Sequence, residues 1–256
     1  MAHTNPSPTL TTTPKNHPIY TDFLAQNLLQ DPVLSHILND LPWHARPSAT
    51  YHLLRTQLLL AAHKARALFV CATPTFSSIP TLREVKDLDP RCCAVVLPPG
   101  ETLMDIGMLG RVNVLTSSAS SGWWNLLPTL GFYFAAWKKY ESEYLGPVEA
   151  VKASVFREGE TFYSVMVMAT AEAQRGKGLA RKVLGKVLER ARREGKPVWA
   201  EASSTSRGFY AQCGFEDVGE AVVLGRRCVE GKETEDVLVF PMVLWPEGYC
   251  RRSNKA

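Results

Sequence analysis

Residues Ala171–Arg193 read AEAQRGKGLARKVLGKVLERARR, and this stretch decides how the C-terminal half of the chain folds. It sets two glycines, Gly176 and Gly178, and two cations, Arg175 and Lys177, directly before a segment of helical periodicity. A helix that begins at glycines exposes unpaired backbone N–H groups and the positive end of its dipole. Glycine also lets a phosphate oxygen approach the main chain, because no Cβ is in the way. The stretch therefore predicts an anion-binding loop followed by a helix.

The segment after the glycines has the periodicity of a helix with one buried face. Its apolar residues recur at intervals of one, three and four, and Arg and Lys fill the opposite side. The stripe consists of Leu179, Val183, Leu184, Val187, Leu188 and Ala191. Residues 162–168 upstream read FYSVMVM and residues 198–202 downstream read VWAEA, both typical of buried strands. A strand, a helix and a second strand at this spacing predict parallel pairing of the two strands.

Apolar spacing and helix breakers predict further elements. Two helices are expected within Ile19–Leu41, separated at Asp31-Pro32, and a third from Ser48 or Thr50 to Lys64. A short helix is expected at 207–213, with the hydroxyls of residues 203–206 as its cap. Further strands are expected at residues 68–72, 93–97, 221–224 and 237–244.

Composition divides the chain into a lead-in and one domain. Residues 1–18 are rich in Thr, Pro and Asn and are expected to be a flexible segment, and residues 19–250 are expected to form a single domain. Residues 101–146 are interpreted as a helical insertion in that domain, either a helical core or in part an apolar wall of a binding pocket. Its aromatic residues include Trp123, Trp124, Phe132, Tyr133, Phe134, Trp137, Tyr140 and Tyr144.

Length and charge exclude several classes of protein. With 256 residues, 45% of them hydrophobic, the chain can bury a substantial core. A net charge of +4 without a dense basic stripe argues against a nucleic-acid partner. The six cysteines form no C-x-x-C pair and have no histidines at zinc spacing, so no metal is expected and the thiols are interpreted as reduced. Without a signal peptide or an apolar run of membrane length, we expect a cytoplasmic protein with no membrane partner.

Spacing separates this glycine loop from two other phosphate-binding loops. A P-loop requires Lys and then Ser or Thr after its last glycine, whereas Leu179 follows Gly178 here. A dinucleotide-binding loop requires a small residue three places after that glycine, and this chain has Arg181 there. The pattern that remains is Arg175-x-x-Gly178-x-Ala180.

That pattern resembles the Q/R-x-x-G-x-G/A pyrophosphate loop of the GCN5-related N-acetyltransferase (GNAT) family. Residues 209–215, FYAQCGF, resemble the family's LYxxxGF segment in order and separation. Residues 97–100, LPPG, and the closing hairpin are similar to fungal-type members. The resemblance implies an α/β (α+β) GNAT fold. Its central mixed sheet would be mostly antiparallel, with a parallel pair at the acetyl-CoA site and helices on its faces.

The same resemblance implies acetyl-CoA as cosubstrate. The backbone N–H of Met168 is then the expected oxyanion donor. Members of the family often have Asn near the start of the helix that precedes their Tyr, whereas this chain offers Ser203, Ser204 and Ser206. The residues expected to bind acetyl-CoA are Met168, Ala169, Thr170, Arg175, Gly176, Lys177, Gly178, Leu179, Ala180 and Ser203.

Acyl transfer from a thioester to an amine requires a neutral nucleophile and a proton for the departing thiolate. Tyr210 is the candidate general acid, because a phenol stays protonated at neutral pH, and the alternative is an aromatic packed on the sheet. An amine with a pKa near 10 must lose a proton before it attacks. Glu201 is the first candidate base, with Glu172 and Asp105 behind it, and the alternative for Glu201 is a solvated or helix-capping carboxylate.

These residues predict an acetyl-CoA-dependent N-acetyltransferase of a small molecule that carries an amine. One alternative is a GNAT-fold enzyme with other chemistry, such as O-acylation, a longer acyl donor or decarboxylation. The other is a module that binds CoA without turnover. The sequence leaves the acceptor open, and it leaves the oligomeric state open because an apolar helix surface can serve a core or a homodimer.

Overall fold

The structure is a computed structural model that describes residues 8–11, 17–41, 43–63, 67–72, 90–101, 138–229 and 232–249. The candidate base Asp105 and most of the aromatic insertion lie outside these residues. The helical elements are α1 (His17–Asn27), α2 (Pro32–Ile37), η1 (Trp43–Ala45), α3 (Arg46–His63), the π-helix η5 (Tyr140–Leu145), α6 (Gly146–Val155), η6 (Glu172–Gln174), α7 (Leu179–Arg193) and α8 (Arg207–Gln212). The strands are β1 (Pro8–Thr11), β2 (Leu68–Ala72), β3 (Cys92–Leu97), β4 (Tyr163–Thr170), β5 (Val198–Ser203), β6 (Glu216–Asp217), β7 (Val222–Val229) and β8 (Lys232–Leu244).

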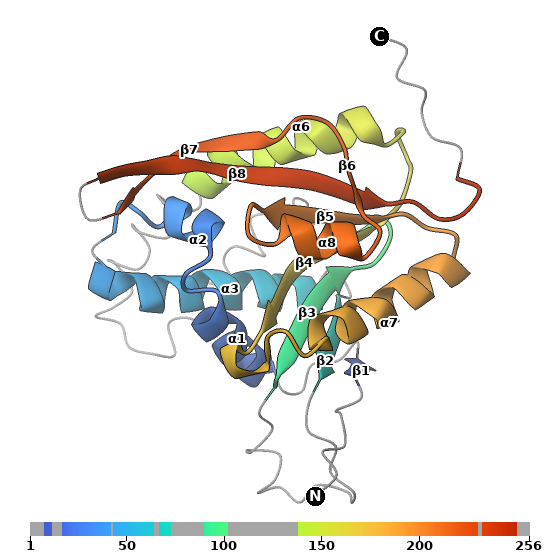
Figure 1. Cartoon of the computed structure of the whole chain (residues 1–256), viewed down its shortest axis with the longest axis horizontal. Helices are drawn as coiled ribbons and strands as arrows, with labels where there is room; N and C mark the ends of the chain where they lie inside the picture. The colour runs from blue at the N-terminus through green and yellow to red at the C-terminus, as the bar shows by residue number, and fades with distance from the viewer. Residues whose placement is uncertain are drawn as a thin grey trace, which may run out of the picture.

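The eight described strands form one sheet with the order β1-β2-β3-β4-β5-β8-β6, and β7 pairs with β8 (Figure 1). Neighbouring strands run antiparallel except for β4 and β5, which are parallel. The parallel pair is joined through α7, because a parallel connection needs a crossover rather than a tight turn. The predicted mixed, mostly antiparallel sheet with one parallel pair is confirmed.

Helices cover both faces of the sheet. Alternate residues of a strand point to opposite faces, so Val70 and Ala94 pack against α7, whereas Phe69 and Val95 pack against α1 and α3. The first face also holds α8, and the second face continues past β5 under α6, where Trp199 is buried. The apolar stripe predicted for α7 is buried in full against the first face.

The two parallel strands pair over a short length only. Their register runs from Tyr163, opposite Val198, to Val165, opposite Ala200, and then ends while both strands continue. A bulge sits at this point on the other edge of β4, because Val95 pairs with Val167 and Val96 pairs with Val165. The extra residue is Met166, and a bulge of this kind bends its strand. The ends of β4 and β5 therefore part from one another.

The structure corrects the sequence prediction in three places. Within the segment expected to be flexible, Pro8–Thr11 forms β1 and pairs with β2, and α1 begins at His17. The helical region expected to end at Gly146 continues as α6, because Pro147 is compatible with the first turn of a helix. The last two strands are longer than predicted, since charged residues extend β7 to Val229 and start β8 at Lys232. Backbone pairing sustains these ends, which an apolar pattern does not reveal.

Burial of the α7 stripe gives a stability prediction. Leu184 is fully buried against the sheet, so Leu184→Ala should lower the free energy of unfolding by about 2–5 kcal/mol, measured by urea denaturation. The exposed side of the same helix provides the control, and Lys186→Ala should change that free energy by less than about 0.5 kcal/mol. Similar small losses for both variants would contradict the described packing of α7.

Candidate active site

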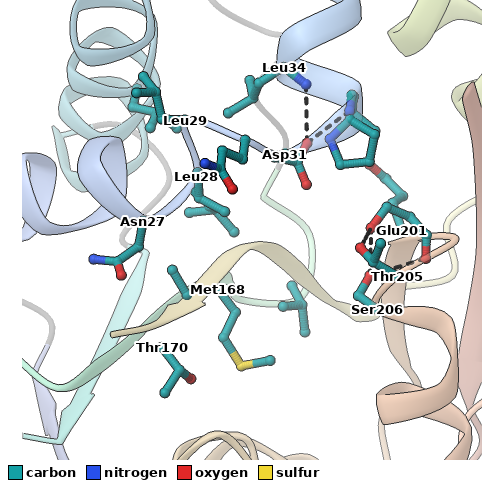
Figure 2. A pocket seen from close by; sticks show the side chains of 18 of the residues that line it. Asn27, Leu28, Leu29, Asp31, Leu34, Met168, Thr170, Glu201, Thr205 and Ser206 are labelled. Atoms are coloured by element: carbon teal, nitrogen blue, oxygen red, sulfur yellow. Dashed lines mark hydrogen bonds between the residues drawn. The ribbon is translucent and has the colours of Figure 1, made fainter. Parts of the chain in front are cut away.

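A cavity of about 760 Å³ opens where β4 and β5 part. Its floor is the end of β4, residues 165–170, and its far side is the connection between α1 and α2. Figure 2 shows Leu28 and Asp31 of that connection across from Met168, with Glu201 of β5 and Ser206 at one end. Residues of α3, η5 and α8 also line the cavity, so elements from both faces of the sheet meet in it.

The glycine loop borders this cavity through Arg175 and Ala180. Gly176 and Gly178 have φ values of 75° and 74°, a left-handed backbone that favours glycine. A Cβ built on either glycine would meet nothing within 4 Å, so the space beside the loop is open. Gly178 is also the N-cap of α7, and the first N–H groups of that helix have no intrahelical partner. The loop therefore leaves room for an anion beside these N–H groups, and the anion site stays a prediction.

Arg175 and Lys177, the two cations of the loop, hydrogen-bond to groups that are close to them in the sequence. The Nε of Arg175 donates to the carbonyl of Thr170 at 3.3 Å, which ties the loop to the end of β4. Lys177 lies on the exposed loop and donates to Gln174. A second, shallow depression of about 500 Å³ runs along α7 next to Gly178 and is lined by Arg181, Lys182 and Lys186 among others. Positive charge thus surrounds the start of α7.

Tyr210 lies on α8 and lines the cavity from the face of the sheet that α7 covers. Its ring packs edge-on against Phe209 and Phe215, each at 5.3 Å between ring centroids. Burial, with smaller contributions from nearby Cys213 and Glu201, raises the pKa of Tyr210 above its ordinary value. The phenol therefore carries its proton at neutral pH, as a general acid must before it acts.

Glu201 lies on β5 and lines the same cavity from the opposite face. Its carboxylate accepts hydrogen bonds from the Tyr144 hydroxyl and from Trp199 Nε1 at 2.7 Å, and Lys152 Nζ lies 3.0 Å from it. Burial acts to raise the pKa of Glu201, but the Lys152 charge and these hydrogen bonds outweigh it and the pKa is lowered. A carboxylate that accepts from this many donors is a weak base, so the surroundings of Glu201 weigh against its predicted role as general base. That role stays a prediction.

Two tyrosines of the π-helix η5 form another part of the lining. Tyr140 and Tyr144 stack at 5.1 Å between ring centroids, and both line the cavity. Burial, followed by the charge of Glu201, raises the pKa of each phenol. They belong to the aromatic set singled out in the sequence, and the other aromatics of that set lie outside the described residues. Asp31, the N-cap of α2, and Gln57 of α3 add polar groups nearby.

The structure brings most of the predicted site residues to this cavity. Six of the residues expected to bind acetyl-CoA line it, together with the two candidate catalytic residues and the weaker candidate Glu172. Gly176, Lys177 and Gly178 lie outside it on the exposed loop, and the side chain of Leu179 is buried in the core beneath α7. The six residues are Met168, Ala169, Thr170, Arg175, Ala180 and Ser203.

The hydroxyl run after β5 does not cap α8 as predicted. The N-cap residue Ser206 makes no side-chain cap hydrogen bond, because its backbone at φ −100° and ψ −15° is not the extended conformation of a capping residue. The Ser203 hydroxyl instead lies 2.9 Å from that of Thr205 and 3.1 Å from that of Ser206. These three hydroxyls line the cavity as one cluster.

Sequence reasoning missed the partners of Glu201. Lys152 of α6 and Tyr144 of η5 reach it from far along the chain, and neither lies in a motif. His36 of α2 was also missed, and its Nε2 lies 2.8 Å from Glu143 of η5. The only signal available was the aromatic cluster itself, because local spacing says nothing about which distant side chain completes a buried ion pair.

One protein-family model matches part of the chain. Residues 114–215 match the sequence model described as the acetyltransferase (GNAT) family. This segment spans less than half of the chain and contains both motifs, the loop at 175–180 and the segment that ends at Phe215. The matched segment is similar to the GNAT family, and the mixed sheet with its parallel pair at the cavity is the arrangement expected of a GNAT fold. No curated protein sequence matches the chain.

Several solved structures resemble the chain at low identity. A histone acetyltransferase HPA2 and related acetyltransferase from Corynebacterium glutamicum has 17% identity and a TM-score of 0.49, covering 95% of this chain and 97% of its own. Arylalkylamine N-acetyltransferase 2 from Aedes aegypti has 17% identity and a TM-score of 0.48, covering 93% and 98%. FeeM, an N-acyl amino acid synthase from uncultured soil microbes, has 12% identity and a TM-score of 0.42, covering 93% and 94%.

Two further observations concern the described residues. They contain no group of three or more His, Cys, Asp or Glu side chains arranged to hold a metal ion. No helix among them is both long enough and apolar enough to cross a membrane.

The lowered pKa of Glu201 gives a pH prediction. An ionised carboxylate stabilised in the fold contributes stability above its ordinary pKa of 4.5, and that stability is lost as the pH falls through the lowered pKa. Glu201→Gln should therefore melt below wild type at neutral pH, and the gap should narrow as the pH falls below 4.5. Melting temperatures across this range measure the effect, with exposed Glu189→Gln as the control. A gap that does not change with pH would contradict the ion pair.

Proposed function

We propose that this protein transfers an acetyl group from acetyl-CoA to the amine of a small molecule. The observation that carries the proposal is the shared cavity between the parted ends of β4 and β5. The glycine loop borders it through Arg175 and Ala180, and Tyr210 lines it from α8. The GNAT match over residues 114–215 supports the acyltransferase class, and the motif positions support CoA as the donor.

The donor is proposed to bind with its diphosphate at the glycine loop. The left-handed backbone at Gly176 and Gly178 leaves the N–H groups at the start of α7 open to an anion. The thioester arm then runs along the end of β4 beside Met168, Ala169 and Thr170. Because β5 no longer pairs with this part of β4, a backbone N–H of β4, proposed to be that of Met168, can donate to the thioester oxygen.

The transfer needs two proton movements. The neutral amine attacks the carbonyl carbon, a C–N bond forms, and the electron pair of the C=O bond moves to the oxygen held by the β4 amide. When this intermediate collapses, the C–S bond breaks and the thiolate takes a proton, for which Tyr210 is the proposed donor. The raised pKa of Tyr210 makes full transfer less favourable, so the phenol acts first as a hydrogen-bond donor to the developing thiolate.

The structure does not single out one group among the described residues that takes the proton from the amine. Glu201 remains the predicted base, with exposed Glu172 as the weaker candidate. Glu201 is engaged by three donors, so a change in its pKa on substrate binding would be required before it could take a proton. Removal of the proton through water in the open cavity is an alternative that needs no side-chain base.

Narrower expectations from the sequence stay predictions. They are the choice of acetyl over a longer acyl group, a fungal-type member, a cytoplasmic location, no nucleic-acid or membrane partner, and a homodimer.

Other chemistry on the same fold, such as O-acylation or decarboxylation, is distinguished from N-acetylation by mass analysis of the product. Amine-dependent release of free CoA separates a transferase from a module that only binds CoA.

A charge at the glycine loop should abolish donor binding. Gly178→Glu sets a carboxylate against the proposed diphosphate, so acetyl-CoA should no longer raise the melting temperature of the variant. Gly159→Glu is the matched control, because Gly159 has a φ of 77° and open space around it but lies outside the cavity. Both variants carry the same backbone strain, and only the loop variant should lose the shift. A normal shift for Gly178→Glu would refute the proposed diphosphate site.

Removal of one hydroxyl tests the proposed acid. Tyr210→Phe keeps the packed ring and should retain acetyl-CoA binding while kcat falls by about 100-fold, in line with general acid catalysis. Release of free CoA measures turnover, and the thermal shift measures binding. Tyr163→Phe is the control, since Tyr163 is a buried tyrosine outside the cavity whose hydroxyl donates to Glu194. Full activity of Tyr210→Phe would remove Tyr210 from the mechanism.

A further inference from the structure

Glu201 sits at the centre of a buried polar network that the transfer step leaves unexplained. Its two oxygens accept from Tyr144 and Trp199, and Lys152 bridges it to Glu149, whose Oε1 lies 2.8 Å from the Lys152 amine. The side chains of Lys152 and Glu201 are 14% and 15% exposed. Because the Tyr144 hydroxyl donates to Glu201, the held position of this carboxylate sets the orientation of that hydroxyl at the cavity.

The hydrogen bond that Tyr144 already makes determines which hydrogen bonds it can form with a ligand. A phenol has one proton to donate and lone pairs that accept. The Tyr144 proton is directed to Glu201, and the structure gives the hydroxyl no other partner among the described residues. Burial and the charge of Glu201 raise the pKa of Tyr144, so this proton stays on the phenol. The Tyr144 oxygen can therefore only accept a hydrogen bond from a ligand.

An oxygen restricted in this way discriminates between ligands. It binds an N–H or O–H donor and gives nothing to an ester, an ether or a quaternary ammonium group. A neutral primary amine has two N–H groups and one lone pair. If one N–H donates to Tyr144, the lone pair stays free to attack a carbonyl carbon. The π-helix also stacks Tyr140 on Tyr144, which adds an aromatic surface beside this oxygen.

We propose that Tyr144 recognises the amine of the acceptor, with its hydroxyl oxygen accepting an N–H hydrogen bond, and that Glu201 and Lys152 are positioning residues that orient this hydroxyl. The acceptor class is then a primary amine attached to an apolar or aromatic body, because Leu28, Leu54 and the Tyr140 ring line the same cavity. This inference rests on the proposed function and assigns Glu201 a task other than that of a base.

Binding of a defined pair of probes tests the inference apart from catalysis. The probes are 2-phenylethylamine and trimethyl(2-phenylethyl)ammonium, which share an aromatic ring and a positive charge, but only the first has N–H donors. Calorimetry on the full chain should give wild type an affinity for the amine that is about 10- to 100-fold higher, the range expected for a hydrogen bond to a charged group. Tyr144→Phe should remove that preference, and Glu201→Gln should reduce it.

A second Tyr–Glu pair in the same chain provides the matched controls. Tyr163 donates to Glu194 at 2.5 Å and neither residue lines the cavity, so Tyr163→Phe and Glu194→Gln should keep the wild-type preference. A wild type without a preference for the amine, or a Tyr144→Phe variant that keeps it, would overturn the inference. Melting temperatures of the variants confirm that each one is folded.

Kinetics then separate this inference from the proposed function. With amine-dependent turnover in wild type, Glu201→Gln should raise the KM for the amine by about 10-fold, and this change in KM should be larger than any change in kcat. A fall in kcat at unchanged KM, with loss of the acidic limb of the pH profile, would make Glu201 a base and refute its positioning role. Wild type that binds both acetyl-CoA and the amine but releases no CoA would refute the proposed function and leave the amine site standing.

Discussion

The separation of β4 and β5 beyond Val165 and Ala200 is the constraint on which the rest of the site depends. Inside a sheet, backbone groups are used by neighbouring strands, and the two faces are sealed from each other. Where the strands part, residues from both faces enter one cavity, so Tyr210 of one face and Glu201 of the other line it together. The bulge at Met166 bends β4 at the same point, and the chain thereby makes a cavity in the middle of its sheet.

A carboxylate on a central strand is tolerated because it is compensated. Glu201 would be costly beside apolar neighbours, and Lys152, Trp199 and Tyr144 supply the charge and the hydrogen bonds that offset this cost. These contacts join α6 and η5 to β5. The pair between His36 and Glu143 joins η5 to α2 in turn. The wall of the cavity opposite the glycine loop is therefore tied together by polar contacts, whereas the core under α7 is apolar.

The two ends of the cavity differ in how they are built. At the loop, the proposed anion binding depends on the main chain, because left-handed glycines leave N–H groups open without requiring particular side chains. At the other end, side chains from α1, α3, η5 and β5 decide what fits. The first kind of site recurs in a sequence motif and can be recognised from spacing. The second kind depends on which elements pack together, so it differs with every arrangement of helices.

The sequence by itself determined the α7 stripe, the glycine loop and the parallel order of β4 and β5, because periodicity and breakers act over a few residues. It also predicted Tyr210 and Glu201 as residues of one site, and both line the cavity. Only the tertiary structure decided that β1 joins the sheet, and that Lys152 and Tyr144 engage Glu201 and lower its pKa. The reason is physical: a pKa and a strand pairing depend on groups brought close in space, and Tyr144 and Glu201 lie 57 residues apart in the chain.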